Sequence, residues 1–311
     1  MKKRFLTFLI CLALSLVFPT AAFAEENTAA SIKMTPVSNY FMLRAGAEQK
    51  YSFKIENTGA KAFSFKVYAA PYNIVDEDYT PGFSEETTYT QITRWVTFKN
   101  NDNDEYSTTA MYSVAPGKEV EITYKVNIPE NLPAGNQQCV LIAETINNDT
   151  LSGTGIKTIS RLAHIVVGHG EGETDGTAEI TDFKLTGLFS KSGVFASAKV
   201  HNKGNIDFST NYSFKIETIF GKTVYSDENT FTMLPETTRK FASSWENSPL
   251  FGVFKVSYIV NANGVVKRSS HLVFIMPIFM LIIALLLLTG IIIWVIMLIR
   301  KRKEKKSRLV V

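Results

Sequence analysis

The chain has 311 residues, of which 45% are hydrophobic and 20% are charged, and its formal net charge is +4. The basic excess lies at the two ends: residues 1–24 and 300–311 hold ten basic side chains and one acidic one, which leaves 23 basic and 28 acidic side chains in residues 25–271. The central part is therefore acidic, without a basic stripe that could follow a phosphate backbone, which excludes nucleic acid as the expected partner.

The first 24 residues have the composition of a secretory signal peptide. Residues 2–4 are basic, an apolar stretch follows them, and Ala22-Phe23-Ala24 supplies the small residues of a cleavage site. We expect cleavage between Ala24 and Glu25 and export of the rest. One cysteine, Cys139, then remains, so no internal disulfide can form, and its setting in QQCVLIAE predicts a buried strand.

From Ser31 onward, apolar and polar residues alternate with a period of two, which is typical of strands with one buried face. KEVEITYKVNI is the clearest example, with five alternating apolar positions from Val120 to Ile128. The polar, glycine-rich segment GHGEGETDGT interrupts the pattern. It predicts a β-domain at residues 31–168, a linker at residues 169–177 about which the first domain can swing, and a second β-domain at residues 178–275.

The two predicted domains resemble each other in the order and spacing of their motifs. In Tyr51–Val67 and in Phe195–Ile216, two apolar strands flank an Asn-x-Gly sequence, and Glu121–Leu141 parallels Arg239–Ile259. Coincidence is the alternative to an internal repeat. Short strands with such connections are typical of Ig-like sandwiches. The expected fold class is mainly β, with two tandem Ig-like β-sandwich domains followed by a single transmembrane helix.

Residues Leu272–Ile299 form a run of 28 residues without a charge, long enough for a membrane span. Pro277 is best tolerated in a first helical turn, so we expect a transmembrane helix at residues 276–299, preceded by the end of a β-strand. The tail, residues 300–311, is basic, which predicts a cytoplasmic anchor of four residues, Arg300, Lys301, Arg302 and Lys303. The expected topology is single-pass type I in the cell membrane, with membrane lipid around the helix and the second domain close to the lipid surface.

The sequence offers little support for catalysis or metal binding. No nucleophile elbow, phosphate loop, dinucleotide fingerprint or zinc motif is present, so we expect no catalytic residues, no metal and no cofactor. Acidic loops at residues 76–78 and 100–105 hold oxygen ligands that suit calcium, but they lack the EF-hand spacing, and ordinary solvated loops are the simpler interpretation.

The most informative loop is Ala70–Thr93, because long connections in small sandwiches are often functional. It and the residues just after it carry five aromatic side chains that we take as a candidate partner-contact set: Tyr72, Tyr79, Phe83, Tyr89 and Trp95. Aromatic rings among polar residues suit contacts with proteins or glycans. The alternative is that the rings fold back onto their own sandwich.

The whole architecture resembles that of the WxL-interacting surface proteins of Gram-positive bacteria and, more closely, related membrane proteins of Saccharibacteria. The segments that carry the resemblance are SNYFMLRAGAEQKYSFKIENTG, IPENLPAGNQ, KTISRLAHIVV and the C-terminal KRKEKKSRLVV. In the Gram-positive family the first domain is associated with peptidoglycan and the second with host-protein contact. The double glycine of that family's first domain is replaced here by Ala134-Gly135-Asn136.

These features together predict a non-enzymatic, membrane-anchored cell-surface protein that binds an extracellular protein or a cell-wall glycan through its β-sandwich domains. A structural spacer, or a subunit of an envelope assembly without its own ligand, is the alternative. An extracytoplasmic enzyme is the third hypothesis.

Overall fold

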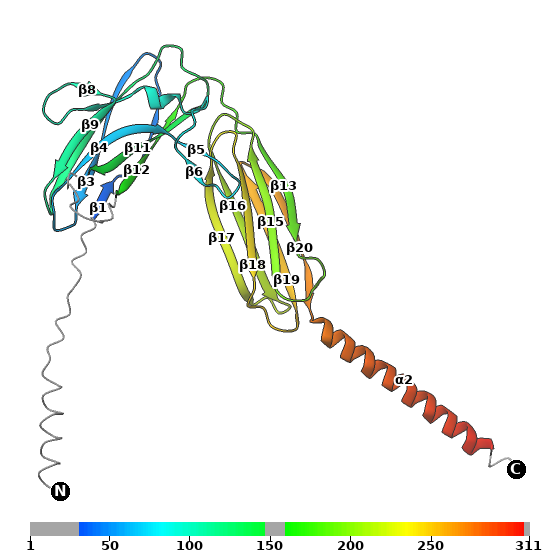
Figure 1. The fold of residues 1–311 in the computed structure, drawn as a ribbon. Helices are drawn as coiled ribbons and strands as arrows, with labels where there is room; N and C mark the ends of the chain where they lie inside the picture. Colours follow the sequence, from blue (N-terminus) through cyan, green and yellow to red (C-terminus); the bar gives the residue numbers. More distant parts are fainter. Residues whose placement is uncertain (1–30, 147–158, 308–311) are drawn as a thin grey trace, which may run out of the picture.

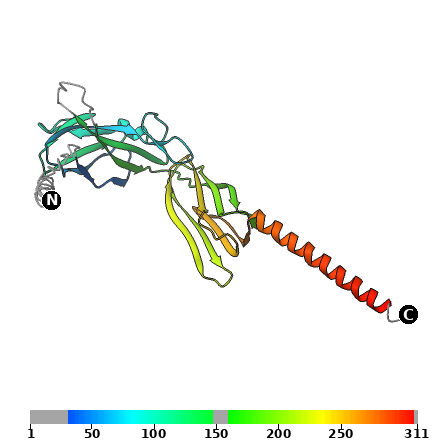
Figure 2. The ribbon, with the colours of Figure 1, turned by 60° about the horizontal axis from the view of Figure 1, so that its bottom comes forward.

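The computed structural model describes residues 31–146 and 159–307, which form two β-sandwich domains and a C-terminal helix (Figure 1). The predicted cleavage site at Ala24 and Glu25 lies outside the described residues. Strands dominate both domains, as the period-two alternation predicts. Figure 2 shows the helix leaving the second domain on the side away from the first.

The first domain packs two five-stranded sheets with the orders β1-β3-β10-β7-β8 and β2-β12-β11-β4-β9. A short hairpin and a 3-10 helix, η1 (Gln91–Arg94), lie in the connection between β4 and β9. The strands are β1 (Ile32–Thr35), β2 (Ser38–Met42), β3 (Glu48–Asn57), β4 (Phe63–Pro71), β5 (Asn73–Ile74), β6 (Pro81–Gly82), β7 (Val96–Lys99), β8 (Tyr106–Ser107), β9 (Thr109–Val114), β10 (Glu119–Asn127), β11 (Asn136–Ile146) and β12 (Arg161–His169).

The second domain packs a three-stranded sheet, β13-β15-β18, against a five-stranded sheet, β14-β20-β19-β16-β17. The last strand of the sandwich runs directly into the helix region. The strands are β13 (Ala178–Leu185), β14 (Phe189–Ser190), β15 (Val194–Asn202), β16 (Phe208–Thr218), β17 (Thr223–Met233), β18 (Thr238–Trp245), β19 (Gly252–Ala262) and β20 (Val265–Ile275).

The two domains repeat one topology. Substituting β13, β15 and β18 for β1, β3 and β10, and β14-β20-β19-β16-β17 for β2-β12-β11-β4-β9, gives the same neighbours in the same order. In the first domain the connection from β4 to β9 is long, whereas the corresponding connection from β16 to β17 is a short turn, Ile219–Lys222. The loop Ala70–Thr93 therefore belongs to an insertion that the second domain lacks.

One asparagine in each domain fixes the equivalent corner through the same hydrogen bonds. The Asn57 side chain donates to the carbonyls of Lys61 and Val114 and accepts from the Gly59 amide, at 2.8, 3.2 and 2.9 Å. Asn202 repeats this pattern at 2.8, 3.2 and 3.0 Å with three equivalent residues, Ile206, Met233 and Gly204. Both asparagines are fully buried. The internal repeat predicted around Asn-x-Gly is therefore present in three dimensions.

Each sandwich encloses its own apolar core. In β10, Ile122, Tyr124 and Val126 are fully buried, as the alternation of that strand predicts. Tyr258 and Phe214 occupy the corresponding interior of the second domain. Burial of a side chain of this size contributes roughly 1.5–3 kcal/mol. Cys139 is buried and unpaired, which confirms the prediction for that residue, and burial raises its pKa.

Residues 272–275, the start of the uncharged run, complete β20, and Pro277 separates that strand from helix α2 (Ile278–Ser307). The predicted strand-to-helix change thus falls where the proline indicates, although the helix extends beyond Ile299. Of the four predicted anchor residues, Arg300 has an exposed side chain on α2. The side chains of Lys301, Arg302 and Lys303 lie outside the described part of the helix. Among the described residues, no helix reaches the length and apolar character that a membrane span requires.

Candidate functional site

The insertion between β4 and β9 is held on the first domain by two adjacent glutamines of β11. The buried Gln137 side chain donates to the Thr88 carbonyl at 2.9 Å and accepts from the Gln91 amide at 3.0 Å. The next residue, Gln138, donates from its side chain to the Tyr72 carbonyl at 3.1 Å. Because both ends of the segment are tied to one central strand, the path of the insertion over the domain is fixed.

The tip of the insertion reaches the second domain (Figure 1). The Tyr79 hydroxyl accepts a hydrogen bond from the Leu234 amide at 2.6 Å and lies 3.1 Å from the Thr237 hydroxyl. The Arg239 guanidinium lies 4.5 Å from the centre of the Tyr79 ring, a cation–π contact. Burial raises the pKa of Tyr79. This aromatic residue therefore belongs to the junction between the two domains.

The neighbours of Tyr79 extend the same contact. The Lys240 amide donates to the Glu77 carbonyl at 2.8 Å, and the Glu77 carboxylate lies 2.8 Å from the Lys199 ammonium. The Tyr89 hydroxyl donates to the Glu236 carboxylate at 3.2 Å. In the acidic loop at residues 76–78, the Asp76 carboxylate accepts a hydrogen bond from the Thr80 amide within a turn. This bond lowers the pKa of Asp76 and accounts for the residue without calcium.

A second set of contacts joins the start of β11 to the loop after β15. The Asn136 amide donates to the Asn205 carbonyl at 2.8 Å, and the Asn136 side chain contacts the Asp207 carboxylate. His169 lies beside both, with its Nδ1 3.0 Å from Asn136 Oδ1 and 3.6 Å from Asp207 Oδ1. A Cβ on Gly135 would lie 2.3 Å from the Asn205 carbonyl oxygen, so the close approach of the two backbones requires glycine.

The glycine-rich linker, about which we expect the first domain to swing, is hydrogen-bonded to residues of both domains. The Gly170 amide donates to the Gly135 carbonyl at 2.9 Å. The Asn205 side chain accepts from the Asp175 amide at 2.7 Å and donates to the Glu173 carbonyl at 2.9 Å. Glycine content indicates the conformational freedom of an isolated backbone. In the folded chain these hydrogen bonds restrain the linker.

The outer face of the β2-β12-β11-β4-β9 sheet carries a hollow of about 410 Å³. Strand β11 is buried along both faces, because its inner side packs in the core and its outer side lies under the insertion. On that outer side Val140 and Ile142 pack with Ala70 and Tyr72. The hollow is lined mainly by apolar groups and has one charged residue, from eight side chains: Tyr68, Ala70, Phe83, Ser84, Ile142, Arg161, Leu162 and Ala163. We call this hollow the sheet groove.

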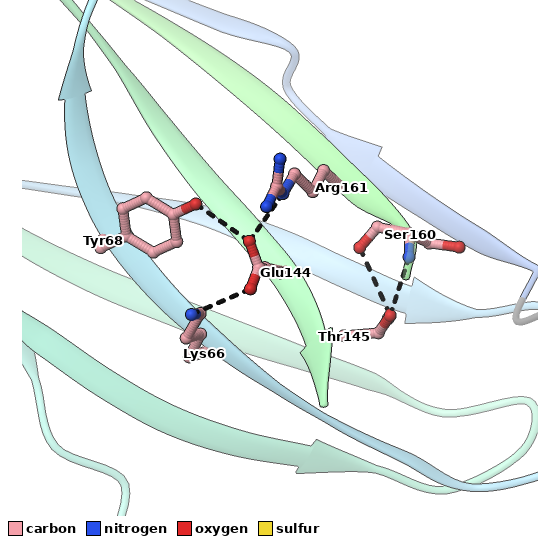
Figure 3. A network of polar contacts seen from close by, with 6 residues as sticks. All are labelled: Lys66, Tyr68, Glu144, Thr145, Ser160 and Arg161. Atoms are coloured by element: carbon pink, nitrogen blue, oxygen red, sulfur yellow. Dashed lines mark hydrogen bonds and ion pairs between the residues drawn. The ribbon is translucent and has the colours of Figure 1, made fainter. Parts of the chain in front are cut away.

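A carboxylate beside the sheet groove is held by three donors from the neighbouring strands (Figure 3). Glu144 of β11 lies opposite Lys66 of β4 and Arg161 of β12 in the strand registers. Its oxygens are 2.9 Å from Lys66 Nζ, 2.6 Å from Arg161 Nε and 3.1 Å from the Tyr68 hydroxyl. The hydrogen bonds from Lys66 and Arg161 lower the pKa of Glu144 to about 2. Glu144 is therefore an ionised, fully engaged group and is poorly placed to act as a general acid or base near neutral pH.

The five aromatic residues of the candidate partner-contact set go to three places. Tyr72 and Phe83 stack with ring centres 6.3 Å apart at the sheet groove, and Phe83 is 41% exposed. Tyr79 and Tyr89 contact the second domain. Trp95 packs against the first core. The single loop proposed from the sequence thus supplies a groove, a junction and a core contact.

Sequence reasoning missed the charged residues around the groove, Glu144, Lys66 and Arg161. One signal was available, since Glu144 is an acidic residue near the end of an otherwise apolar strand, QQCVLIAE. Its partners come from strands that are distant in sequence, so the cluster follows only from the sheet order. Within the described residues, no group of three or more His, Cys, Asp or Glu side chains is placed to hold a metal ion.

No protein-family model matches the chain, and no curated protein matches it. Solved structures with a similar fold include the class 5 fimbrial chaperone CfaA, with a TM-score of 0.38 and 11% identity over 79% of this chain and 100% of its own. The Escherichia coli chaperone DraB gives 0.37 and 10% over 78% and 98%. The CsuC–CsuE chaperone–tip adhesion subunit complex from Acinetobacter baumannii Csu pili gives 0.39 and 11% over 78% and 98%. Similarity at this level carries no conclusion about ligand or activity.

Proposed function

We propose that the chain is an exported, single-pass membrane protein with both sandwich domains outside the membrane and its basic tail in the cytoplasm. The support is the uncharged run Leu272–Ile299, followed by a tail with seven basic residues and one acidic residue. In both views α2 stands clear of the domains (Figures 1 and 2). Large apolar side chains such as Leu286 and Trp294 are exposed along it. A helix that is apolar on all sides is favourable in lipid, where no polar face is needed. The resemblance to WxL-interacting surface proteins supports the same topology.

On this anchor the first domain acts as a non-enzymatic binding module for an extracellular protein. The observation that carries this proposal is the sheet groove, an apolar hollow that opens on the outer face of the first domain beside two aromatic rings of the insertion. Apolar pockets with a charged rim are the usual sites for the anchoring side chains of protein partners.

The chemistry of the groove favours a protein over a glycan. Ala70, Ile142 and Ala163 offer no hydrogen bonds from their side chains, whereas a sugar needs several donors and acceptors around its hydroxyls. Arg161 uses its Nε on Glu144, and among the described residues its terminal nitrogens make no hydrogen bond. A partner segment that inserts an apolar side chain and places a carboxylate over Arg161 would match both features.

A photo-crosslinker in place of Phe83, in cells that express the full chain, tests this proposal. We expect a defined protein adduct from position 83 and none from the matched control at Met111, which is 66% exposed on the edge strand β9. Ala163→Trp, which fills the groove from an exposed position, should reduce the adduct at least tenfold, and Met111→Trp should not. An adduct unaffected by Ala163→Trp would argue against the groove.

The alternative function, a rigid spacer without its own ligand, is favoured by one observation, the fixed junction between the domains. Tyr79, Glu77, Asn136 and Asn205 set the relative placement of the two sandwiches, which a spacer requires and a tethered binding module does not. Absence of any adduct from position 83, together with retained envelope function, would favour the spacer.

A further inference from the structure

Three loops at one end of the second domain expose large apolar side chains in pairs. They connect β13 to β14, β16 to β17, and β18 to β19. We call this set the apolar collar, and its members, with their exposed fractions, are Leu188 (58%), Phe189 (72%), Ile219 (60%), Phe220 (91%), Leu250 (71%) and Phe251 (66%). Clustered exposed apolar residues mark an interaction surface, whereas single ones need no explanation.

The strand registers place all three loops at the end of the sandwich from which α2 leaves. Gly252, directly after Phe251, pairs with Ile275, the last residue of β20. Thr218, directly before Ile219, pairs with Phe254 near the same end of β19. Phe189 itself pairs with Phe274. At the opposite end of this domain, the loops at residues 203–207 and 234–237 expose no large apolar side chain, and the β19–β20 turn is followed by two partly exposed valines, Val265 (40%) and Val266 (52%).

The collar is hydrogen-bonded to the residues that lead into the helix. The Phe274 amide donates to the Leu188 carbonyl at 2.8 Å, and the Met276 amide donates to the Ser190 carbonyl at 2.9 Å. The Phe189 and Phe274 rings stack with centres 5.5 Å apart. Because Ile278 begins the helix only two residues after Met276, these bonds hold the collar level with the start of α2.

The internal repeat shows what this end of a domain does elsewhere in the chain. In the first domain, the insertion and the loop before β11 occupy the places of the β16–β17 and β18–β19 loops, and both contact the second domain through Tyr79 and Asn136. The same end of the second domain has no further domain after it in the described residues; the chain continues there only as α2. The end of the first domain that contacts the second therefore corresponds in topology to the end of the second domain that bears the apolar collar.

We infer that the apolar collar inserts into the outer leaflet of the lipid bilayer around α2. The inference rests on the proposed membrane anchor, since an apolar surface beside the start of a spanning helix must lie at the lipid interface. Phenylalanine and leucine are typical of the face that an interfacial segment buries in lipid, and five of the six collar residues are of these two types. Two exposed lysines lie beside the collar, Lys191 just after β14 and Lys222 in the β16–β17 loop. With one acidic residue there, Glu246, they give this end a small positive charge that suits anionic headgroups.

The test measures membrane depth in the full chain, reconstituted in vesicles of phosphatidylcholine and phosphatidylglycerol. Single cysteines that replace Phe220, Phe251, Met111 or Gly290 carry a fluorophore, and nitroxide-labelled lipid chains act as the quencher; the native Cys139 is buried. All four positions are open, because the three side chains are at least 66% exposed and a Cβ at Gly290 would have no neighbour within 4 Å. We expect quenching at positions 220 and 251 at least threefold above that at position 111.

The label at position 290 separates failure of the collar from failure of the anchor. Strong quenching at 290 with quenching at 220 and 251 no greater than at 111 would overturn the collar and leave the anchor intact. Absence of quenching at 290 would overturn both. Labels at 220 and 251 that are shielded from lipid and from aqueous iodide alike would show a protein–protein contact and would also overturn the inference.

Discussion

Glu144 shows how the position of one residue determines its charge. It lies on the central strand of a sheet, where an ionised carboxylate is costly unless its oxygens are hydrogen-bonded. Lys66, Tyr68 and Arg161 supply those bonds from the two neighbouring strands (Figure 3). The low pKa of Glu144, about 2, is the consequence of these donors.

The depressed pKa predicts a stability that falls in acid. An unfolded glutamate has a pKa of about 4.3, so the contribution of Glu144 is fully present above about pH 5 and is lost as the pH falls through about 2. We expect Glu144→Gln to lower the free energy of unfolding by about 1–2 kcal/mol at pH 7, because the cationic donors lose their charged acceptor. The difference from the wild type should shrink towards pH 2. Urea unfolding at pH 7, 4 and 2.5 measures this difference.

The control is Glu119→Gln, which breaks the exposed pair with Lys54 and should change the free energy of unfolding little. Equal pH dependence in the wild type and Glu144→Gln would contradict the prediction.

The paired corner asparagines give a second prediction at the level of single residues. Asn202→Ala leaves two carbonyls and one amide in a buried corner without their partner, which should cost about 2–4 kcal/mol in the second domain. Asn57→Ala should cost the first domain a similar amount, because its hydrogen bonds are the same. Scanning calorimetry of the full chain in detergent measures both, with the exposed Asn229→Ala as control. A loss below about 0.5 kcal/mol at either asparagine would show that water replaces the side chain.

At the scale of elements, the insertion between β4 and β9 distinguishes two otherwise equivalent domains. The second domain closes the corresponding connection in four residues, Ile219–Lys222. In the first domain, β5 and β6 project the connection onto β18 and the turn before it, where Tyr79, in a left-handed conformation with φ of 69°, reaches the Leu234 amide. The insertion thus both lines the sheet groove, through Phe83 and Ser84, and holds the two domains together as a latch.

Removal of one hydroxyl tests the latch. Tyr79→Phe keeps the ring over Arg239 but leaves the Leu234 amide without its acceptor. We expect amide exchange at Leu234 to accelerate about tenfold, the effect of losing about 1.4 kcal/mol, with little change in the melting temperature. Hydrogen–deuterium exchange resolved by mass spectrometry measures it. Tyr106 lies in the same insertion, but its ring contacts Lys125 of the first domain. Tyr106→Phe should therefore leave amide exchange at Leu234 unchanged. Unchanged exchange in Tyr79→Phe would show that the hydroxyl does not hold the latch.

The strands and the repeat could be predicted from the sequence because alternation and Asn-x-Gly corners are local patterns. The alternation from Val120 to Ile128 directly predicts which side chains of β10 are buried. Pro277 predicts where β20 ends and the helix begins. The junction could not be predicted, because Tyr79 and Leu234 are 155 residues apart and nothing in either local sequence names the other. The lining of the sheet groove could not be predicted either, because its residues come together only through the sheet order β12-β11-β4. The composition of the linker did not reveal its hydrogen bonds, because they depend on residues outside it such as Asn205.

At the scale of the whole molecule, the two domains contact each other end to end. One end of the first domain meets the second through two separate contacts, one from the insertion and one from the start of β11. Two contacts that do not share residues resist rotation about either one. The groove of the first domain is therefore presented in a fixed direction relative to the second domain and α2.

This arrangement predicts a narrow distribution of distances between the domains that widens only when both contacts are broken. Spin labels on Met111→Cys and Thr223→Cys report the distance across the junction, since both sites are exposed and the native Cys139 is buried. Tyr79→Ala or Asn136→Ala alone weakens one contact, in which the Glu77 carbonyl or the Asn136 backbone amide still bonds to the second domain, and should broaden the distribution slightly. The combined variant should broaden it several-fold without unfolding either core, because Tyr79 packs only against the outside of the second core and Asn136 belongs to neither apolar cluster. Pulsed electron paramagnetic resonance of the full chain in nanodiscs measures it. A wild-type distribution as wide as that of the combined variant would show that the domains move freely and that the groove has no fixed direction.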